Sequence, residues 1–172
     1  MPIRIAALNL SHATRPKAIP DGLTAALLGL EPDVVVLTEY VDGGGRYSFK
    51  RALKDGGLGY VQVSRAKSYT PGTYYNQVLI ASRQRSVPME SPSYGPYPGL
   101  ETNRLTVSLP DLTVTGFRMP GGATKTGAAD RDAAWRWSAG NIAGDVLIGD
   151  LNINPAKSGV AHRRAFEALR QE

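Results

Sequence analysis

The chain has no cysteine among its 172 residues, and it has only two histidines, His12 and His162. The absence of cysteine excludes disulfide bonds and metal sites built from thiolates. A metal ion would therefore be held by oxygen ligands or by the two imidazoles, a set that favours Mg²⁺, Mn²⁺ or Ca²⁺.

Long apolar runs are also missing. No stretch reaches the length of a membrane span, and the N-terminal Met-Pro-Ile-Arg leads into an expected strand rather than the apolar part of a signal peptide. We therefore expect a cytoplasmic protein without a membrane span. The length and the 42% apolar content predict a single domain over residues 1–172. The sequence shows no repeat and does not predict an oligomeric state.

The net charge of +5 is unevenly distributed, because residues 43–89 hold eight basic residues and one acidic residue, Asp55. A basic segment around a carboxylate site attracts a polyanion such as the backbone of a nucleic acid. A solvated basic surface explains the same composition. The basic residues are Arg46, Lys50, Arg51, Lys54, Arg65, Lys67, Arg83 and Arg85.

Periodicity and turn residues predict a mixture of strands and helices. Asp21 is expected as the N-cap of the first helix, and four prolines between Ser86 and Thr102 predict a long irregular loop. The many strands favour two packed sheets with helices outside over a parallel doubly wound sheet. Strands are expected over residues 4–10, 34–38, 60–64, 77–82, 103–109, 112–117 and 146–148, and helices over residues 22–30, 47–54, 130–141 and 158–170.

Polar residues follow three of the expected strands. Asn9 ends the first strand, and Glu39 follows a β-branched run. Asp150 and Asn152 follow the last strand in the sequence Gly-Asp-Leu-Asn, and residues two apart in a strand point to the same face. An acid and an amide on one face can hold a phosphate and orient a water. The same residues also form turns, and an acid in the position of Glu39 also caps loops or pairs with an arginine.

In this order and spacing the chain resembles the endonuclease/exonuclease/phosphatase superfamily, which has the DNase I-like fold. The resemblance covers Arg4 to about Pro155 and is carried by Pro32–Glu39, Gln77–Arg83 and Asp145–Asn152. It implies an α+β fold, a four-layer αββα sandwich of two mostly antiparallel sheets. It also implies a Mg²⁺-dependent phosphohydrolase, with Mn²⁺ as the alternative metal.

The resemblance further implies a role for each polar residue. Glu39 would hold the metal, with Asn9 beside it. Asp150 would align or deprotonate the attacking water, and Asn152 would bind the scissile phosphate. Arg104 stands where the family often has a basic residue and is assigned to substrate binding. A metal on Glu39 would neutralise the non-bridging phosphate oxygens during hydrolysis.

Two departures from the family pattern bear on activity. Where the family usually carries a histidine, this chain has Phe117 and Arg118, and Arg118 is expected to stabilise phosphate charge instead. The family's closing Asp-His strand has no counterpart before Glu172. The chain is therefore expected to be a fragment, or a shortened member with altered or lost activity. Neither histidine of the chain replaces the missing ones by motif.

We consider three functions. The leading hypothesis is a metal-dependent phosphodiesterase that acts on nucleic acid. The alternatives are a non-catalytic module of the same fold that binds a polyanion, and a phosphatase for a small phosphorylated metabolite or a lipid headgroup. Tyr69, Tyr74 and Tyr75 would stack on bases in the first case, although aromatic pairing in a hairpin explains them almost as well.

Overall fold

The computed structural model describes residues 2–11, 19–43, 46–65, 76–90, 98–119, 125–142 and 144–152. These residues form two four-stranded sheets. Sheet A has the order β1-β2-β4-β3, in which β1 and β2 are parallel and the other neighbours are antiparallel. Its strands are β1 (Ile5–Asn9), β2 (Val34–Tyr40), β3 (Tyr60–Val63) and β4 (Gln77–Ser82).

Sheet B has the order β5-β6-β7-β8, in which only β7 and β8 are parallel. A parallel pair needs a long crossover. The helix α1 (Asp21–Gly29) lies in the crossover from β1 to β2, and α3 (Lys125–Asn141) lies in the crossover from β7 to β8. The strands of sheet B are β5 (Val87–Pro88), β6 (Arg104–Ser108), β7 (Thr113–Arg118) and β8 (Val146–Asp150).

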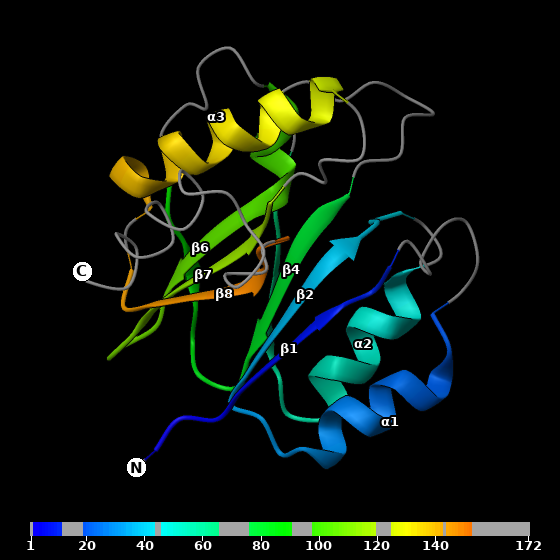
Figure 1. Ribbon diagram of the computed structural model, residues 1–172. Coiled ribbons are helices and arrows are strands. Elements are labelled where there is room, and N and C mark those ends of the chain that lie inside the picture. Colours follow the sequence, from blue (N-terminus) through cyan, green and yellow to red (C-terminus); the bar gives the residue numbers. More distant parts are fainter. Residues whose placement is uncertain are drawn as a thin grey trace.

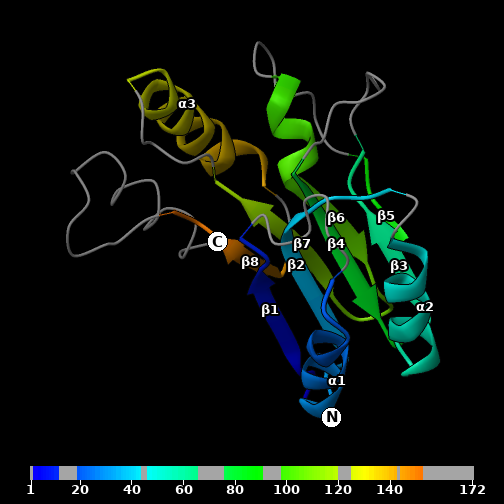
Figure 2. The same ribbon diagram turned by 90° about the vertical axis from the view of Figure 1, so that its right-hand side faces the viewer.

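Helices cover the outer faces of both sheets (Figures 1 and 2). The helices α1 and α2 (Tyr47–Asp55) pack on sheet A through Leu27, Phe49 and Leu53. On the opposite side of the molecule, α3 packs on sheet B through Trp135, which contacts the same core as Phe117. A short 3₁₀ helix, η2 (Pro98–Asn103), precedes β6. The layers are helix, sheet, sheet and helix, which confirms the predicted α+β sandwich.

Strand β2 is buried along its whole length, as its β-branched run favours. Val34 and Val36 lie in the core between the two sheets, whereas Val35 and Leu37 lie in the core under α1 and α2. Burial of each such side chain contributes about 1.5–3 kcal/mol. The strand is therefore a fixed support for the polar residues that end it.

The two sheets approach each other closely at Gly116 of β7. A Cβ atom on this residue would lie 2.7 Å from Val78 Cγ1 and 2.8 Å from Val36 Cγ1. Packing therefore requires a glycine at this position. The close contact brings β7 against β2 two residues before Arg118.

Some boundaries differ from the sequence expectation. The N-cap of α1 is Pro20 rather than Asp21, because Pro20 keeps an extended ψ of 134° and the helix begins at the next residue. Strand β2 continues through Tyr40, and α3 begins at Lys125 rather than near residue 130. The final helix expected over residues 158–170 lies outside the described residues.

The segment expected to be an irregular loop, residues 86–102, contains regular structure. Val87 and Pro88 form β5 and pair with β6, and η2 occupies the end of the segment. Proline is tolerated in β5 because this strand is at the edge of its sheet. Within the described ranges, no helix is both long enough and apolar enough to span a membrane.

Candidate active site

Four strands from the two sheets end at one edge of the sandwich. In sheet A, Asn9 on β1 pairs in register with Thr38 on β2, one residue before Glu39. In sheet B, Arg118 on β7 pairs in register with Asp150 on β8. Both pairs of strands are parallel, so each pair ends together, and two polar contacts join the ends across the sandwich.

The first contact joins the edge strands β1 and β8. Asn9 Nδ2 donates a hydrogen bond of 2.6 Å to Asp150 Oδ2. Asn9 Oδ1 accepts a hydrogen bond of 2.8 Å from the backbone N–H of Ser11, which fixes the orientation of the amide. Asn9 therefore holds the Asp150 carboxylate from the other sheet.

A bulge in β2 turns Glu39 toward sheet B. The register between β2 and β4 shifts between Leu37 and Tyr40, and Glu39 has a φ of 53°. In a regular strand Thr38 would face sheet B and Glu39 would face the helices. Instead Tyr40 packs in the core under the helices and Glu39 contacts β7. The left-handed backbone, which costs on the order of 1 kcal/mol, thus re-aims one carboxylate.

The second contact between the sheets is an ion pair. Arg118 Nε donates to Glu39 Oε1 at 2.9 Å, and the side chains are only 16% and 7% exposed, respectively. Pairing with an arginine is one of the alternatives considered for Glu39 from the sequence. Within the described part of the chain, Nε is the only guanidinium nitrogen of Arg118 that donates a hydrogen bond, so its two terminal amino groups remain available.

Asp150 and Asn152 form a turn directly after β8. The backbone N–H of Asn152 donates to Asp150 Oδ1 at 3.0 Å, and Asn152 Nδ2 donates to the Met119 carbonyl at 2.6 Å. Gly149 precedes the turn with a φ of 147°, and a Cβ there would overlap the Phe117 carbonyl. Asp150 is therefore held through both carboxylate oxygens, and one amide hydrogen of Asn152 is already used.

Arg104 is buried at the start of β6, where it pairs in register with Phe117. Its Nε and Nη2 lie 3.4 Å from Thr106 Oγ1, and its Nη1 donates to the Asn141 carbonyl at 3.3 Å. The guanidinium lies over the Trp137 ring, 5.2 Å from its centroid. These contacts tie sheet B to α3, and a role for Arg104 in substrate binding stays a prediction.

Sequence reasoning missed Thr38. The residue is 1% exposed, and its hydroxyl has no hydrogen-bond partner among the described residues. Because Thr38 pairs in register with Asn9 and precedes Glu39, the hydroxyl lies within the group of polar strand ends. A buried polar atom without a partner indicates a place for a water molecule or an ion.

The donor set fits a small hydrated cation. Mg²⁺ prefers oxygen ligands, binds one or two carboxylates and keeps several waters. Glu39, Asn9 Oδ1 and the Thr38 hydroxyl supply oxygen atoms of this kind, and Asp150 adds a second carboxylate nearby. No group of three or more acidic residues, histidines or cysteines that could hold a metal occurs within the described ranges. The set is therefore sparse, and Arg118 already neutralises one carboxylate.

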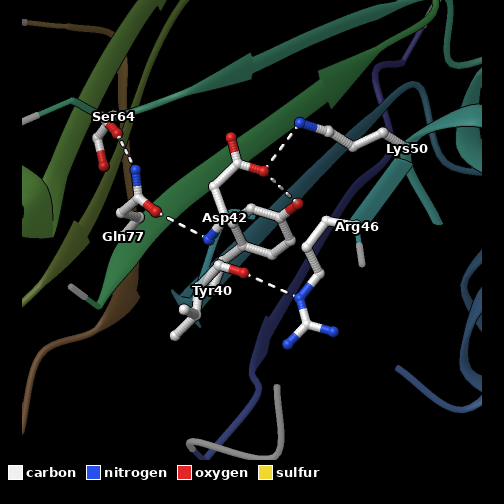
Figure 3. Close-up of polar contacts among 7 residues, drawn as sticks. Tyr40, Asp42, Arg46, Lys50, Ser64 and Gln77 are labelled. Atoms are coloured by element: carbon white, nitrogen blue, oxygen red, sulfur yellow. Dashed lines mark hydrogen bonds and ion pairs between the residues drawn. The ribbon is translucent and has the colours of Figure 1, made fainter. Parts of the chain in front are cut away.

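Beyond the bulge, a polar network holds Asp42 (Figure 3). Asp42 Oδ1 accepts hydrogen bonds from the Tyr40 hydroxyl at 3.1 Å and from Lys50 Nζ at 2.8 Å. The Asp42 N–H donates to Gln77 Oε1 at 2.9 Å, and Gln77 Nε2 donates to the Ser64 carbonyl. Burial, and then the Asp42 carboxylate, raise the pKa of the Tyr40 hydroxyl above its ordinary value. The network ties the end of β2 to α2, β3 and β4.

A cleft of about 760 Å³ opens beside this network and runs from β3 to β6. Its lining carries charges of both signs. The basic residues are Lys50, Arg65 and Arg104, and the acidic residues are Asp42, Glu90 and Glu101. Of the predicted site residues, only Arg104 belongs to its described lining. The cleft is therefore separate from the four strand ends.

The basic segment does not form a single surface. Arg51 pairs with Asp55 at 3.6 Å on α2, whereas Arg83 and Arg85 follow β4 at the other end of sheet A. Arg83 Nε donates to the Pro32 carbonyl at 2.9 Å. Lys67, both histidines and the three clustered tyrosines, residues 69, 74 and 75, lie outside the described residues.

Solved structures share this architecture. An endonuclease/exonuclease/phosphatase from Beutenbergia cavernae DSM 12333 is 21% identical, with a TM-score of 0.61. An AP endonuclease from Archaeoglobus fulgidus is 16% identical, with a TM-score of 0.64. A 3′ phosphatase from Neisseria, bound to a product DNA hairpin, is 19% identical, with a TM-score of 0.60. The fold is DNase I-like.

The DNase I-like match covers almost all of this chain but only part of the other proteins. It spans 88% of this chain and 47% of the Beutenbergia protein. It spans 98% of this chain and 70% of the archaeal endonuclease, and 99% of this chain and 71% of the Neisseria phosphatase. No protein-family model matches the sequence, and no curated protein matches it. At these identities the shared property is the fold.

Proposed function

We propose that this chain is a metal-dependent hydrolase of phosphate esters and that its substrate is a phosphodiester of nucleic acid. The observation that carries the proposal is the meeting of four strand ends from two sheets. Asn9 bonds to Asp150 and Arg118 bonds to Glu39, so two carboxylates, an amide and a guanidinium share one edge of the DNase I-like sandwich. These groups are the ones that phosphate hydrolysis requires.

Asp150 is the residue that positions the attacking water. Its carboxylate is oriented by Asn9 from the opposite sheet and by the Asn152 backbone N–H. A carboxylate held in this way can accept a proton from a water in a fixed direction. Asn9 is therefore a positioning residue for Asp150 as well as a source of an amide oxygen.

Arg118 is the residue of this chain that neutralises charge on the phosphate, and a divalent cation would assist it. The terminal amino groups of Arg118 can bind two phosphate oxygens in a fork. Glu39 and Asn9 would hold Mg²⁺, or Mn²⁺ in its place, which would neutralise a non-bridging oxygen and lower the pKa of a bound water. The second amide hydrogen of Asn152 is free to reach a phosphate oxygen, because its first one is used by Met119.

The nucleic-acid substrate is supported by two considerations. Two proteins of similar fold are named for action on DNA, an AP endonuclease and a phosphatase bound to a DNA hairpin. In this chain, Lys54 is exposed on α2, which adds positive charge on the outside of sheet A. Such charge favours binding of a phosphate backbone.

Hydrolysis by the Asp150→Asn and Glu39→Gln variants tests the proposal. The assay uses bis(4-nitrophenyl) phosphate, single-stranded DNA and plasmid DNA with Mg²⁺. We expect the rate to fall by about 10²–10⁴-fold in each variant, because each loses a charged group that acts on the reacting phosphate or water. Asp111→Asn is the matched control, since Asp111 is an exposed acid in the turn between β6 and β7.

The outcomes separate the three hypotheses. Full activity in a purified Asp150→Asn or Glu39→Gln preparation would contradict the proposed site. Hydrolysis of a small monoester without cleavage of DNA would favour the small-molecule phosphatase. Salt-dependent DNA binding without turnover, unchanged by Asp150→Asn, would favour the binding module.

A further inference from the structure

The ion pair between Arg118 and Glu39 places a cation of the protein itself on the carboxylate that the proposed function gives to a metal. The bond joins Arg118 Nε to Glu39 Oε1 at 2.9 Å, and both side chains are largely buried. A charge pair screened from water interacts more strongly than one on the surface. A metal ion that binds Glu39 therefore has to bind a carboxylate that already carries the guanidinium of Arg118.

The charge balance of the site also favours competition between the guanidinium and a cation. Glu39 and Asp150 bring two negative charges to the edge of the sandwich, and Arg118 cancels one of them. A divalent cation and the guanidinium on the same carboxylate would leave an excess of positive charge in a partly buried place. Release of Arg118 from Glu39 would leave two carboxylates to balance the two charges of the cation.

The geometry also allows the guanidinium to move. Arg118 is the last residue of β7, and among the described residues its side chain is held by the single bond from Nε. Arg104 on the neighbouring strand is different, because Thr106, Asn141 and Trp137 hold its guanidinium on several sides. Loss of one bond therefore frees the head of Arg118, whereas Arg104 stays fixed.

We propose that Arg118 and the divalent cation compete for Glu39, so that binding of the cation releases the guanidinium toward the phosphate of the substrate. This inference rests on the proposed function. It makes Arg118 the residue that sets the affinity of the site for metal and that orders the binding events. The metal binds first, and the phosphate then meets an arginine that is no longer paired.

The first test measures Mn²⁺ affinity without any substrate, from the electron paramagnetic resonance signal of free Mn²⁺. We expect Arg118→Met to bind Mn²⁺ at least tenfold more tightly than the wild type, because the guanidinium no longer competes with the cation for Glu39. Lys50→Met is the matched control, since it removes a positive charge from Asp42 rather than from Glu39. Its affinity should change less than threefold. Glu39→Gln should abolish Mn²⁺ binding both in the wild type and in Arg118→Met.

A second measurement uses the wild-type protein, because Arg118→Met leaves a buried carboxylate without its arginine and can fail to fold. The side-chain Nε–H of Arg118 is followed by ¹⁵N nuclear magnetic resonance and is assigned with Arg118→Lys. We expect its exchange with solvent to accelerate at least tenfold when Mg²⁺ saturates the protein, since the bond to Glu39 is lost.

Each contrary result is distinct. Equal Mn²⁺ affinity in the wild type and Arg118→Met, with loss in Glu39→Gln, overturns the competition and leaves the proposed metal site intact. An Nε–H signal that Mg²⁺ saturation does not change overturns it in the same way. Absence of Mn²⁺ binding at millimolar concentration in both proteins overturns the competition and the proposed metal site together.

Discussion

At the scale of single residues, backbone conformation decides where the polar groups point. Among the described residues, four non-glycine residues have a positive φ: Ser11, Glu31, Glu39 and Asn152. Three of them lie at the edge where the four strands end. Such conformations are uncommon outside glycine and cluster at functional sites. The strain at Glu39 and Asn152 is therefore consistent with a site that requires particular side-chain directions.

Gly116 offers a test of the packing that supports this edge. Gly116→Ala should lower the free energy of unfolding by about 1–3 kcal/mol, because its Cβ would press on Val36 and Val78. The measurement is urea unfolding followed by circular dichroism. Gly22→Ala in α1 is the control, since nothing lies within 4 Å of its Cβ, and we expect no loss of stability. Equal stability of Gly116→Ala and the wild type would mean that the sheets can separate at no cost.

At the scale of the element, the end of β2 combines a bulge at Glu39 with packing and a hydrogen bond made by Tyr40. The bulge turns Glu39 toward sheet B, and Tyr40 then packs with Phe49 of α2, with ring centroids 6.3 Å apart. The hydroxyl of Tyr40 donates to Asp42 (Figure 3). These contacts fix the strand directly after Glu39, so the strained residue is held by the one that follows it.

The raised pKa of Tyr40 predicts a pH dependence of stability. The folded state keeps the phenol proton to a higher pH than the unfolded chain, where the pKa is 10.0. The unfolded state therefore loses its proton first, so this contribution is complete below pH 10 and declines above it, by about 1.4 kcal/mol per pH unit. Urea unfolding between pH 9 and 11 should show a shallower decline in Tyr40→Phe than in the wild type.

The control for this prediction is Tyr47→Phe, because Tyr47 is 68% exposed at the start of α2. Its pH profile should match that of the wild type. If Tyr40→Phe declines as steeply as both, the phenol of Tyr40 titrates alike in the folded and unfolded states, contrary to the expectation.

The same strand shows what can be predicted from sequence. The β-branched run predicted a strand covered on both faces, because such residues fit a buried sheet. The strand ends at Asn9 and Asp150 can also be predicted from the sequence, since apolar runs stop at polar residues there. The bulge in β2 cannot be predicted in this way, because side-chain alternation in a regular strand assigns Glu39 to the wrong face. A bulge depends on pairing with β4, forty residues further along the chain, and no local pattern records it.

Side-chain partners were the least predictable part of the site. The sequence offers pairing with an arginine as one alternative for Glu39, but it does not identify Arg118 or the partner of Asn9. It also gave no reason to single out Thr38, a common residue in strands. Such contacts depend on how two sheets face each other, and that arrangement is set by packing over the whole core.

At the scale of the whole molecule, the edge strands β1 and β8 meet through Asn9 and Asp150. Asn9→Ala should lower the free energy of unfolding by about 1 kcal/mol, because it loses a partly buried hydrogen bond to Asp150 and an exposed one from the Ser11 N–H. It should also accelerate amide hydrogen exchange in β8, measured by mass spectrometry. Asn141→Ala is the control, since the hydrogen bond of Asn141 Nδ2 among the described residues stays within α3, to the Trp137 carbonyl at 2.9 Å. Unchanged exchange in β8 would show that the strands are held by apolar contacts alone.

The ion pair between Glu39 and Arg118 has a consequence for how the sequence evolves. Loss of either partner breaks a largely buried ion pair between two sheets, and a single replacement is costly in a way that a joint replacement is not. Lineages that derive from this chain should therefore change the two positions together. A carboxylate at 39 would be inherited with a cation at 118, and a neutral residue at one position would be accompanied by a neutral residue at the other.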